Sequence, residues 1–216
     1  MRYTTVLFDL DGTLLDTLDD ITDAVNYTLF HFGKPIVERD AVRRLLGHGA
    51  EFLLAGASGE CRGTEALEKI KDFYLPYYEL HSDIKTAPYP GIIKLVSDLK
   101  DAGVNCAVVS NKPDGAVKAL AKIKFDGVFK LAVGESETIK AKPDPSGVIS
   151  AMHALGGDLS NTIYVGDSEV DVLTAKNAGI PVIGVSWGFR DEDVLRREGA
   201  DYVVSDAQEI FDIVNG

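Results

Sequence analysis

The second half of the chain has the hydrophobic pattern of short buried strands that alternate with amphipathic helices. Five short runs rich in apolar and β-branched residues are predicted strands: Asn105–Ser110, Lys130–Val133, Thr162–Val165, Pro181–Ser186 and Tyr202–Ser205. Helical patterns lie between them, such as Gly91–Ala102, where apolar residues recur every three or four positions and the pattern stops at Gly103. This alternation is typical of βαβ units in a mostly parallel sheet.

A further strand is predicted at Tyr3–Leu10, and the residues after it have helical rather than strand patterns. The clearest helix runs from Leu18 to Phe32 and ends at Gly33-Lys34-Pro35. Three more helices are predicted at Glu38–Leu46, at Glu51–Ala55 and around Leu67–Tyr77, the last with a kink at Pro76. We therefore predict an α/β, Rossmann-like core with helices on both faces of a parallel sheet, formed by residues 1–15 and 87–216, and an inserted helical domain at 16–86.

Composition and charge narrow the classes of partner. The 216 residues are 45% hydrophobic and 26% charged, which is typical of a folded globular protein, and the formal net charge is −12. Such an acidic chain has no broad basic surface for nucleic acid, and anionic membranes would repel it. We expect neither as a partner, and the sequence does not predict the oligomeric state.

The cysteines and the apolar segments indicate a cytoplasmic protein. Cys61 and Cys106 lie far apart and lack the spacing of a metal site, so we expect reduced thiols. The N-terminus has no pattern of a secretory signal. No apolar stretch approaches the roughly 18 residues that a membrane span needs.

The strongest chemical signal is Asp9-Leu10-Asp11-Gly12-Thr13, at the end of the first strand. Alternation along a strand sends Asp9 and Asp11 to the same side, where the two carboxylates repel unless a cation lies between them. Such oxygen ligands suit Mg²⁺, which also binds substrate phosphate. One carboxylate could instead act as nucleophile and the other as general acid and base. Alone, the motif is equally typical of a solvated turn.

A second acidic pair, Asp167 and Asp171, lies where the strand ending at Val165 gives way to a helix. Residues four apart share one side of a helix, so this pair could hold a metal. The alternatives are that Asp167 caps the helix and that Asp171 stabilises its N-terminus electrostatically.

Two further motifs offer groups that bind phosphate. Ser110 and Asn111 supply hydroxyl and amide donors at the end of a strand, although for Ser110 taken alone a helix N-cap is the favoured interpretation. Lys142, just before Pro143, could neutralise a carboxylate and an incoming phosphate, although most surface lysines do neither. Three of these motifs lie at the ends of strands, and the Lys142 motif lies in a connection expected on the same side. Ligand sites of open α/β sheets lie at the carboxyl ends of strands.

Taken in order, the four motifs resemble those of the haloacid dehalogenase superfamily in its phosphatase branch. They are Asp9-x-Asp11-Gly12-Thr13, Ser110-Asn111, Lys142-Pro143 and Gly166-Asp167-x-x-x-Asp171. The resemblance covers nearly the whole chain, because the helical insertion at 16–86 is similar to that family's α-helical cap domain. The dehalogenases themselves lack an aspartate at the place of Asp11, which favours phosphoryl transfer over carbon–halogen cleavage.

The resemblance implies a role for each motif. Asp9 would be the nucleophile that attacks phosphorus, and Asp11 the acid and base that serves the leaving alcohol and then water. Ser110, Asn111 and Lys142 would bind the phosphoryl group. The Asp9 side chain, the Asp11 backbone carbonyl and Asp167 would hold Mg²⁺, with Asp171 in support.

Within the superfamily the chain is most similar to phosphoglycolate phosphatases. The similarity rests on Leu46-Gly47-His48-Gly49-Ala50, Pro88-Tyr89-Pro90-Gly91 and Val185-Ser186-Trp187-Gly188-Phe189. It implies that Gly47, His48, Gly49 and Trp187 are candidate specificity residues, although a plain helix–helix turn and a packed aromatic are alternatives. We assign no chemistry to Arg43, Arg44 or Lys34, although any of them could reach a substrate carboxylate.

The expected activity is hydrolysis of a small phosphorylated metabolite, for which 2-phosphoglycolate is the first candidate. A pyrophosphatase, a nucleotidase or a sugar-phosphate mutase could use the same machinery. A phospho-accepting signalling domain and a catalytically silent phosphate-binding module are alternatives of other classes. The inserted helices and Asp11 argue against signalling, because a switch needs a long-lived acyl phosphate.

Overall fold

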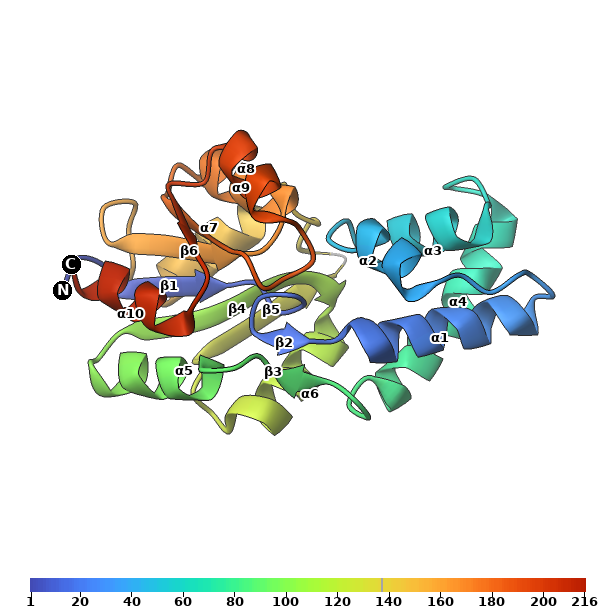
Figure 1. Cartoon of the computed structure of the whole chain (residues 1–216), viewed down its shortest axis with the longest axis horizontal. Helices are drawn as coiled ribbons and strands as arrows, with labels where there is room; N and C mark the ends of the chain where they lie inside the picture. Colours follow the sequence, from blue (N-terminus) through green and yellow to red (C-terminus); the bar gives the residue numbers. More distant parts are fainter. Residues whose placement is uncertain (137) are drawn as a thin grey trace.

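The structure is a computed structural model that describes residues 1–136 and 138–216. A parallel β-sheet forms its centre (Figure 1). Within those residues the sheet has six strands in the order β5-β4-β1-β6-β7-β8. They are β1 Thr5–Phe8, β4 Asn105–Pro113, β5 Leu131–Glu135, β6 Thr162–Gly166, β7 Val182–Val185 and β8 Tyr202–Val204. Each neighbouring pair is parallel. The predicted α/β, Rossmann-like fold is therefore confirmed.

Helices cover both faces of this sheet. They are α5 Ile92–Asp101, α6 Asp114–Phe125, α7 Ser146–Ala154, α8 Glu169–Ala178, α9 Glu192–Glu198 and α10 Ala207–Asn215. Val6 and Phe8 of β1 pack in a cluster with α5, α6 and α10, whereas Leu7 packs in a second cluster with α7, α8 and α9. Because side chains alternate along a strand, the fully buried β1 supplies both halves of the core.

The four helices after β1 have a hydrophobic core of their own. They are α1 Leu18–His31, α2 Arg39–Leu45, α3 Ala50–Ser58 and α4 Glu65–His81. Their buried apolar residues form one cluster, to which the part of the chain beyond them contributes Phe189. Figure 1 shows these helices beside one end of the sheet. Whether 16–86 is an independent domain stays a prediction.

The prediction of no strand between the first strand and residue 91 is wrong. Leu15–Asp16 (β2) and Ala87–Pro88 (β3) form an antiparallel pair where the chain leaves the core and returns to it. Two-residue strands are too short to leave a period of alternation in the sequence. Their pairing brings the two ends of the helical insertion together.

Other boundaries differ from the prediction by several residues. β4 continues to Pro113, so Ser110 is not its last residue and Asn111 lies within the strand rather than after it. The helix predicted at Glu51–Ala55 spans Ala50–Ser58, and Pro76 lies inside α4, which continues to His81. In the part of the chain that the structure describes, no helix is both long enough and apolar enough to cross a membrane.

Candidate active site

Five of the predicted site residues meet at the carboxyl end of the sheet. Asp9 follows β1, Ser110 lies near the end of β4, and Asp167 follows β6. Lys142 comes from the connection between β5 and α7, and Asp171 from the first turn of α8. Parallel strands bring these sites together because their carboxyl ends share one edge of the sheet.

Lys142 is the cation at the centre of this group. Its buried Nζ lies 2.9 Å from Asp9 Oδ1 and 2.7 Å from Asp171 Oδ1, and it donates to the Tyr164 hydroxyl at 3.0 Å. Burial alone would lower the pKa of Lys142, but the carboxylates of Asp171 and Asp9 raise it well above its usual value. The lysine is therefore charged.

One lysine does not balance the acidic groups around it. Carboxylate oxygens of Asp9, Asp167 and Asp171 lie within 4.8 Å of one another, and all three residues are buried. Burial raises the pKa of Asp9 to about 7, with the Asp171 and Asp11 carboxylates adding to the rise and Lys142 opposing it. Burial, with Asp171 and Asp9, also raises the pKa of Asp167 well above its usual value. The excess of buried acid and the oxygen donors fit a divalent cation such as Mg²⁺.

The two aspartates after β6 have different surroundings. Asp171 Oδ2 accepts hydrogen bonds from Ser168 Oγ (2.6 Å) and from the backbone N–H groups of Ser168 and Asp167. The N-cap of α8 is Ser168, so Asp167 does not cap this helix. The carboxylate of Asp167 instead accepts from Thr13 Oγ1 at 3.0 Å and from Phe189 N at 2.7 Å. Asp171 therefore holds the Lys142 ammonium group with one oxygen and the backbone N–H of Asp167 with the other.

The side chain of Asn111 is fully engaged within the protein. Its Nδ2 donates to the carbonyl oxygens of Gly47 and Lys142, both at 2.9 Å, and its Oδ1 accepts from Lys142 N at 2.5 Å. The side chain therefore ties the Lys142 loop to the turn between α2 and α3. A phosphate contact by Asn111 would have to come from its backbone N–H.

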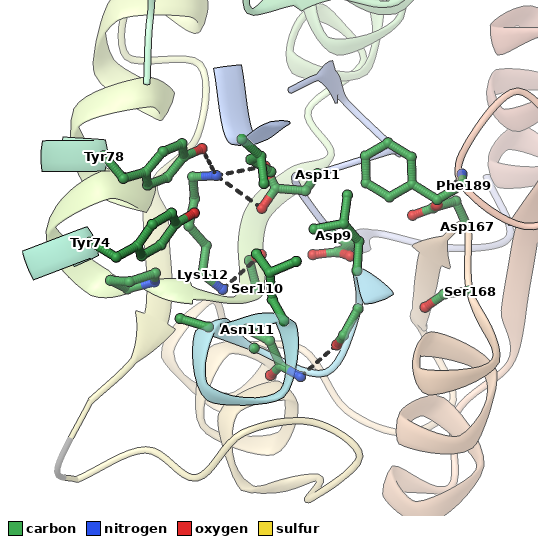
Figure 2. Close-up of a pocket in the computed structure, with 17 residues that line it drawn as sticks. Asp9, Asp11, Tyr74, Tyr78, Ser110, Asn111, Lys112, Asp167, Ser168 and Phe189 are labelled. Carbon is green, nitrogen blue, oxygen red and sulfur yellow. Dashed lines mark hydrogen bonds and ion pairs between the residues drawn. The ribbon is translucent and has the colours of Figure 1, made fainter. Parts of the chain in front are cut away.

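Lys112 is a site residue that the motifs alone did not reveal. Its Nζ lies 2.8 Å and 3.1 Å from the two carboxylate oxygens of Asp11, and it also hydrogen bonds to the hydroxyl of Tyr78 (Figure 2). The side chain is only 2% exposed. The signal was present in the sequence, because alternation within a longer β4 puts Lys112 on the same side as Ser110.

The pocket above these groups has a polar floor and a largely apolar wall (Figure 2). The pocket encloses about 600 Å³, including its open mouth. Its floor includes Asp9, Asp11, Ser110, Lys112 and Asp167. The wall comes mostly from the helical insertion: Ile21, Leu46, Gly47, Gly49, Ala50, Leu53, Tyr74 and Tyr78, with Phe189 from the core. Gly47 and Gly49 thus line the pocket, and their contact with a substrate stays a prediction.

The other specificity candidates lie outside the pocket lining. His48 is exposed, with Nε2 3.3 Å from Glu169 Oε1. The Trp187 indole N–H donates to the Thr13 carbonyl at 3.1 Å, so it supports the loop after Asp11. Arg43 contacts Asp191, and Lys34 contacts Glu60, so neither points at a substrate in this structure.

A parallel α/β sheet gathers acidic residues and one buried lysine at its carboxyl end, beside an inserted set of helices. This is the arrangement of a class of hydrolases. The chain belongs to the haloacid dehalogenase-like hydrolase family, whose model matches residues 6–185. The resemblance seen in its motifs is thereby confirmed.

Curated relatives and solved structures agree with this membership. A phosphoglycolate phosphatase of Caulobacter vibrioides is 36% identical over 204 residues, which cover 93% of this chain and 86% of the relative. An N-acetylmuramic acid 6-phosphate phosphatase of Pseudomonas aeruginosa is 30% identical, covering 100% of this chain and 96% of the relative. A solved structure from Lactobacillus delbrueckii, of a protein for which phosphoglycolate phosphatase activity has been predicted, is 34% identical with a TM-score of 0.91 and covers 99% of both chains.

Proposed function

We propose that this hydrolase is a Mg²⁺-dependent phosphomonoesterase that works through an aspartyl-phosphate. The observation that carries the proposal is that Asp9 and Asp11 line one pocket, with Lys142 paired to Asp9. Asp9 is buried beside a charged lysine, and Asp11, two residues later, lines the same pocket. A nucleophile and an acid–base group are thus within reach of one bound phosphate.

In the first half of the proposed reaction, a carboxylate oxygen of Asp9 attacks phosphorus. The bond between phosphorus and the ester oxygen breaks, and the electron pair stays on that oxygen. The Asp11 carboxyl gives its proton to the leaving oxygen, which departs as an alcohol. Lys142 and Ser110 would bind the phosphoryl oxygens during this transfer.

In the second half, a water oxygen attacks the phosphorus of the aspartyl-phosphate. The bond between phosphorus and the Asp9 oxygen breaks, which restores the carboxylate. Asp11 accepts the proton of the water and is protonated again for the next cycle. Inorganic phosphate then leaves.

The side chains of Asp9 and Asp167 and the backbone carbonyl of Asp11 would hold Mg²⁺. When bound, the ion would offset the negative charge of the carboxylates and of the phosphoryl group. Asp171 would not compete for it, because its oxygens are engaged by Lys142, Ser168 and backbone N–H groups. We propose that Asp171 instead orients Lys142 and Asp167.

The names of the relatives suggest the substrate class. Both named activities act on small phosphate monoesters, and 2-phosphoglycolate is the first candidate because phosphoglycolate phosphatases recur among the relatives. N-acetylmuramic acid 6-phosphate makes a sugar phosphate the second. We propose that the protein acts on such metabolites in the cytoplasm, where reduced Cys61 and Cys106 would persist.

The test is a screen of phosphorylated metabolites with added Mg²⁺, run on the wild type and on Asp9→Asn. The screen includes 2-phosphoglycolate, hexose phosphates, nucleoside monophosphates and pyrophosphate. We expect turnover of at least one phosphate monoester in the wild type and its loss, by at least about 1,000-fold, when the nucleophile is removed. Chelation of Mg²⁺ should abolish turnover as well.

Circular dichroism controls for folding of the variant. Near-normal turnover by Asp9→Asn would refute the nucleophile, and near-normal turnover with chelator would refute the metal. A phospho-protein that persists for minutes would favour the signalling alternative.

A further inference from the structure

Lys112 connects the catalytic end of the sheet to the helical insertion. It lies on β4, and its Nζ contacts both carboxylate oxygens of Asp11, which follows β1. The same Nζ hydrogen bonds to the hydroxyl of Tyr78 on α4 and lies 4.5 Å from the centre of its ring. Figure 2 shows the three side chains joined by these contacts.

The partnership of Lys112 and Asp11 is strongly constrained by burial. A buried ammonium is costly unless it is paired and hydrogen bonded. In the part of the chain that the structure describes, Asp11 is the only carboxylate within ion-pair distance of Lys112. The side chain of Asp11 is 18% exposed, at the pocket. Turning Asp11 away from its present position would leave Lys112 buried without a counter-charge.

Tyr78 brings the helical insertion into this arrangement. It is 2% exposed, and the ring of Tyr74, one turn earlier on α4, stacks on it with the centres 5.4 Å apart. Its hydroxyl contacts Lys112 rather than Asp11. The position of α4 therefore determines where the ammonium group lies, and the ammonium group determines where the Asp11 carboxylate lies.

We propose that Lys112 and Tyr78 are positioning residues for Asp11, and that they matter most in hydrolysis of the aspartyl-phosphate. The inference rests on the proposed function. In the first half-reaction the leaving oxygen is still bonded to phosphorus and is presented to Asp11. In the second, the water is mobile, so the orientation of Asp11 must select it. Lys112 and Tyr78 exchange no proton in either step.

The test is Lys112→Met assayed with 4-nitrophenyl phosphate. Nitrophenolate is a good leaving group that needs no proton, so formation of the aspartyl-phosphate depends little on Asp11. We expect kcat to fall at least about tenfold while the fraction of enzyme trapped as phosphoenzyme by acid quench rises. Tyr78→Phe, which keeps the ring and removes only the hydroxyl, should change both quantities in the same direction by less.

Lys124→Met is the matched control. Lys124 on α6 pairs with Asp83, just after α4, so it also links the sheet region to the insertion but does not line the pocket. We expect its kcat and phosphoenzyme level to match the wild type within about twofold.

Three kinetic outcomes would overturn the inference. The phosphoenzyme level of Lys112→Met could fall together with kcat, which would place Lys112 in phosphate binding or in the fold. Both quantities could stay within twofold of the wild type. The loss could also be confined to the KM for 2-phosphoglycolate, which would make Lys112 a ligand of the substrate carboxylate.

A wild type that neither turns over any phosphate ester nor forms a phosphoenzyme would refute the proposed function instead. Crystal structures of the wild type and of Lys112→Met test the placement without any turnover. We expect the Asp11 carboxylate to change its orientation in the variant. An unchanged Asp11 would overturn the inference by itself.

Discussion

Packing around Asp167 leaves no room for side chains at two neighbouring glycines. A Cβ at Gly188 would lie 2.5 Å from Asp167 Oδ2 and from the Gly12 carbonyl oxygen, and a Cβ at Gly12 would also overlap the Asp167 carboxylate. Gly12 in addition has a backbone φ of +85°, which residues other than glycine rarely adopt. The position of the proposed metal ligand thus depends on these two glycines as well as on its hydrogen bonds from Thr13 and Phe189.

Gly188→Ala should therefore weaken metal binding without removing any ligand. The added methyl group has to displace the Asp167 carboxylate, and loss of such support typically costs roughly 10–100-fold in metal affinity. A titration of activity with Mg²⁺ measures the shift. Gly115→Ala is the control, because its Cβ would meet only Glu79 Oε1, at 3.0 Å, on an exposed side chain. Equal Mg²⁺ requirements in the two variants would contradict the prediction.

The two thiols differ in reactivity because one is buried and the other is exposed. Burial raises the pKa of Cys106 on β4 to about 12, whereas Cys61 is exposed. In the native protein at pH 8 we expect one thiol to react with a disulfide reagent, and two in denaturant. Cys61→Ser should leave none reactive until the protein unfolds. Rapid reaction of native Cys61→Ser would show that β4 is accessible.

The raised pKa of Cys106 also makes the free energy of unfolding depend on pH. Well below pH 9 the thiol is neutral in both the folded and the unfolded chain and contributes no pH dependence. Between about pH 9 and 12 the unfolded chain loses this proton and the folded one keeps it, so the free energy of unfolding falls as the pH rises. Urea titrations of the wild type and Cys106→Ala at pH 8 and 10.5 should show a smaller drop in the variant.

At the scale of elements, the C-terminal end of α2 is fastened to the loop after β7 by Arg190. Its guanidinium donates to the carbonyl oxygen of Leu46 (2.9 Å), the C-cap of α2, and to that of Arg43 (3.3 Å), which also accepts from Leu46 N. Glu169 holds the guanidinium with contacts of 2.7 Å and 3.1 Å. Together with the bond from Asn111 to Gly47, this contact keeps the α2–α3 turn over the pocket.

Arg190→Met should loosen that turn. We expect faster amide hydrogen exchange at residues 43–50, where the guanidinium no longer holds the carbonyl groups, and a KM raised several-fold because the ordered turn is populated less. Arg196→Met, which removes only an exposed pair with Glu192 within α9, is the control. Unchanged hydrogen exchange at residues 43–50 would mean that the apolar contacts of the insertion are enough to hold this turn without Arg190.

The elements also show what the sequence could and could not predict. The proposed metal ligands were recognisable because each follows a strand with its own pattern, as Asp9 follows β1 and Asp167 follows β6. The contact between Lys112 and Tyr78 was not, because it joins β4 to α4 and its geometry depends on how these two elements pack. The same reason applies to Trp187, whose partner, the Thr13 carbonyl, lies 174 positions away.

At the scale of the whole molecule, the acidic site is a source of both function and instability. Bringing Asp9, Asp167 and Asp171 together around one lysine opposes folding, and a cation that binds only the folded chain reverses this. Mg²⁺ at about 100 times its Kd should add roughly 2.7 kcal/mol to the free energy of unfolding. For a chain of this size, that corresponds to a rise in Tm of about 5 °C or more.

Differential scanning fluorimetry with Mg²⁺ and with chelator measures this shift. Asp167→Asn should lose most of it, since one of the proposed ligands is gone. A shift of equal size in the variant would mean that Mg²⁺ acts elsewhere on a protein with net charge −12.

The β2–β3 pair has a consequence for how such a protein can evolve. Leu15 lies opposite Pro88 and Asp16 opposite Ala87, so the chain enters and leaves the helical insertion at adjacent points. A turn of about two residues could join the two strands as in a hairpin. Everything between them can therefore be lengthened, shortened or exchanged while the strand order of the sheet and the positions of Asp9 and Asp167 stay the same. Changes in the helical insertion can therefore alter the wall of the pocket, and with it the substrate, without moving the residues at the carboxyl end of the sheet.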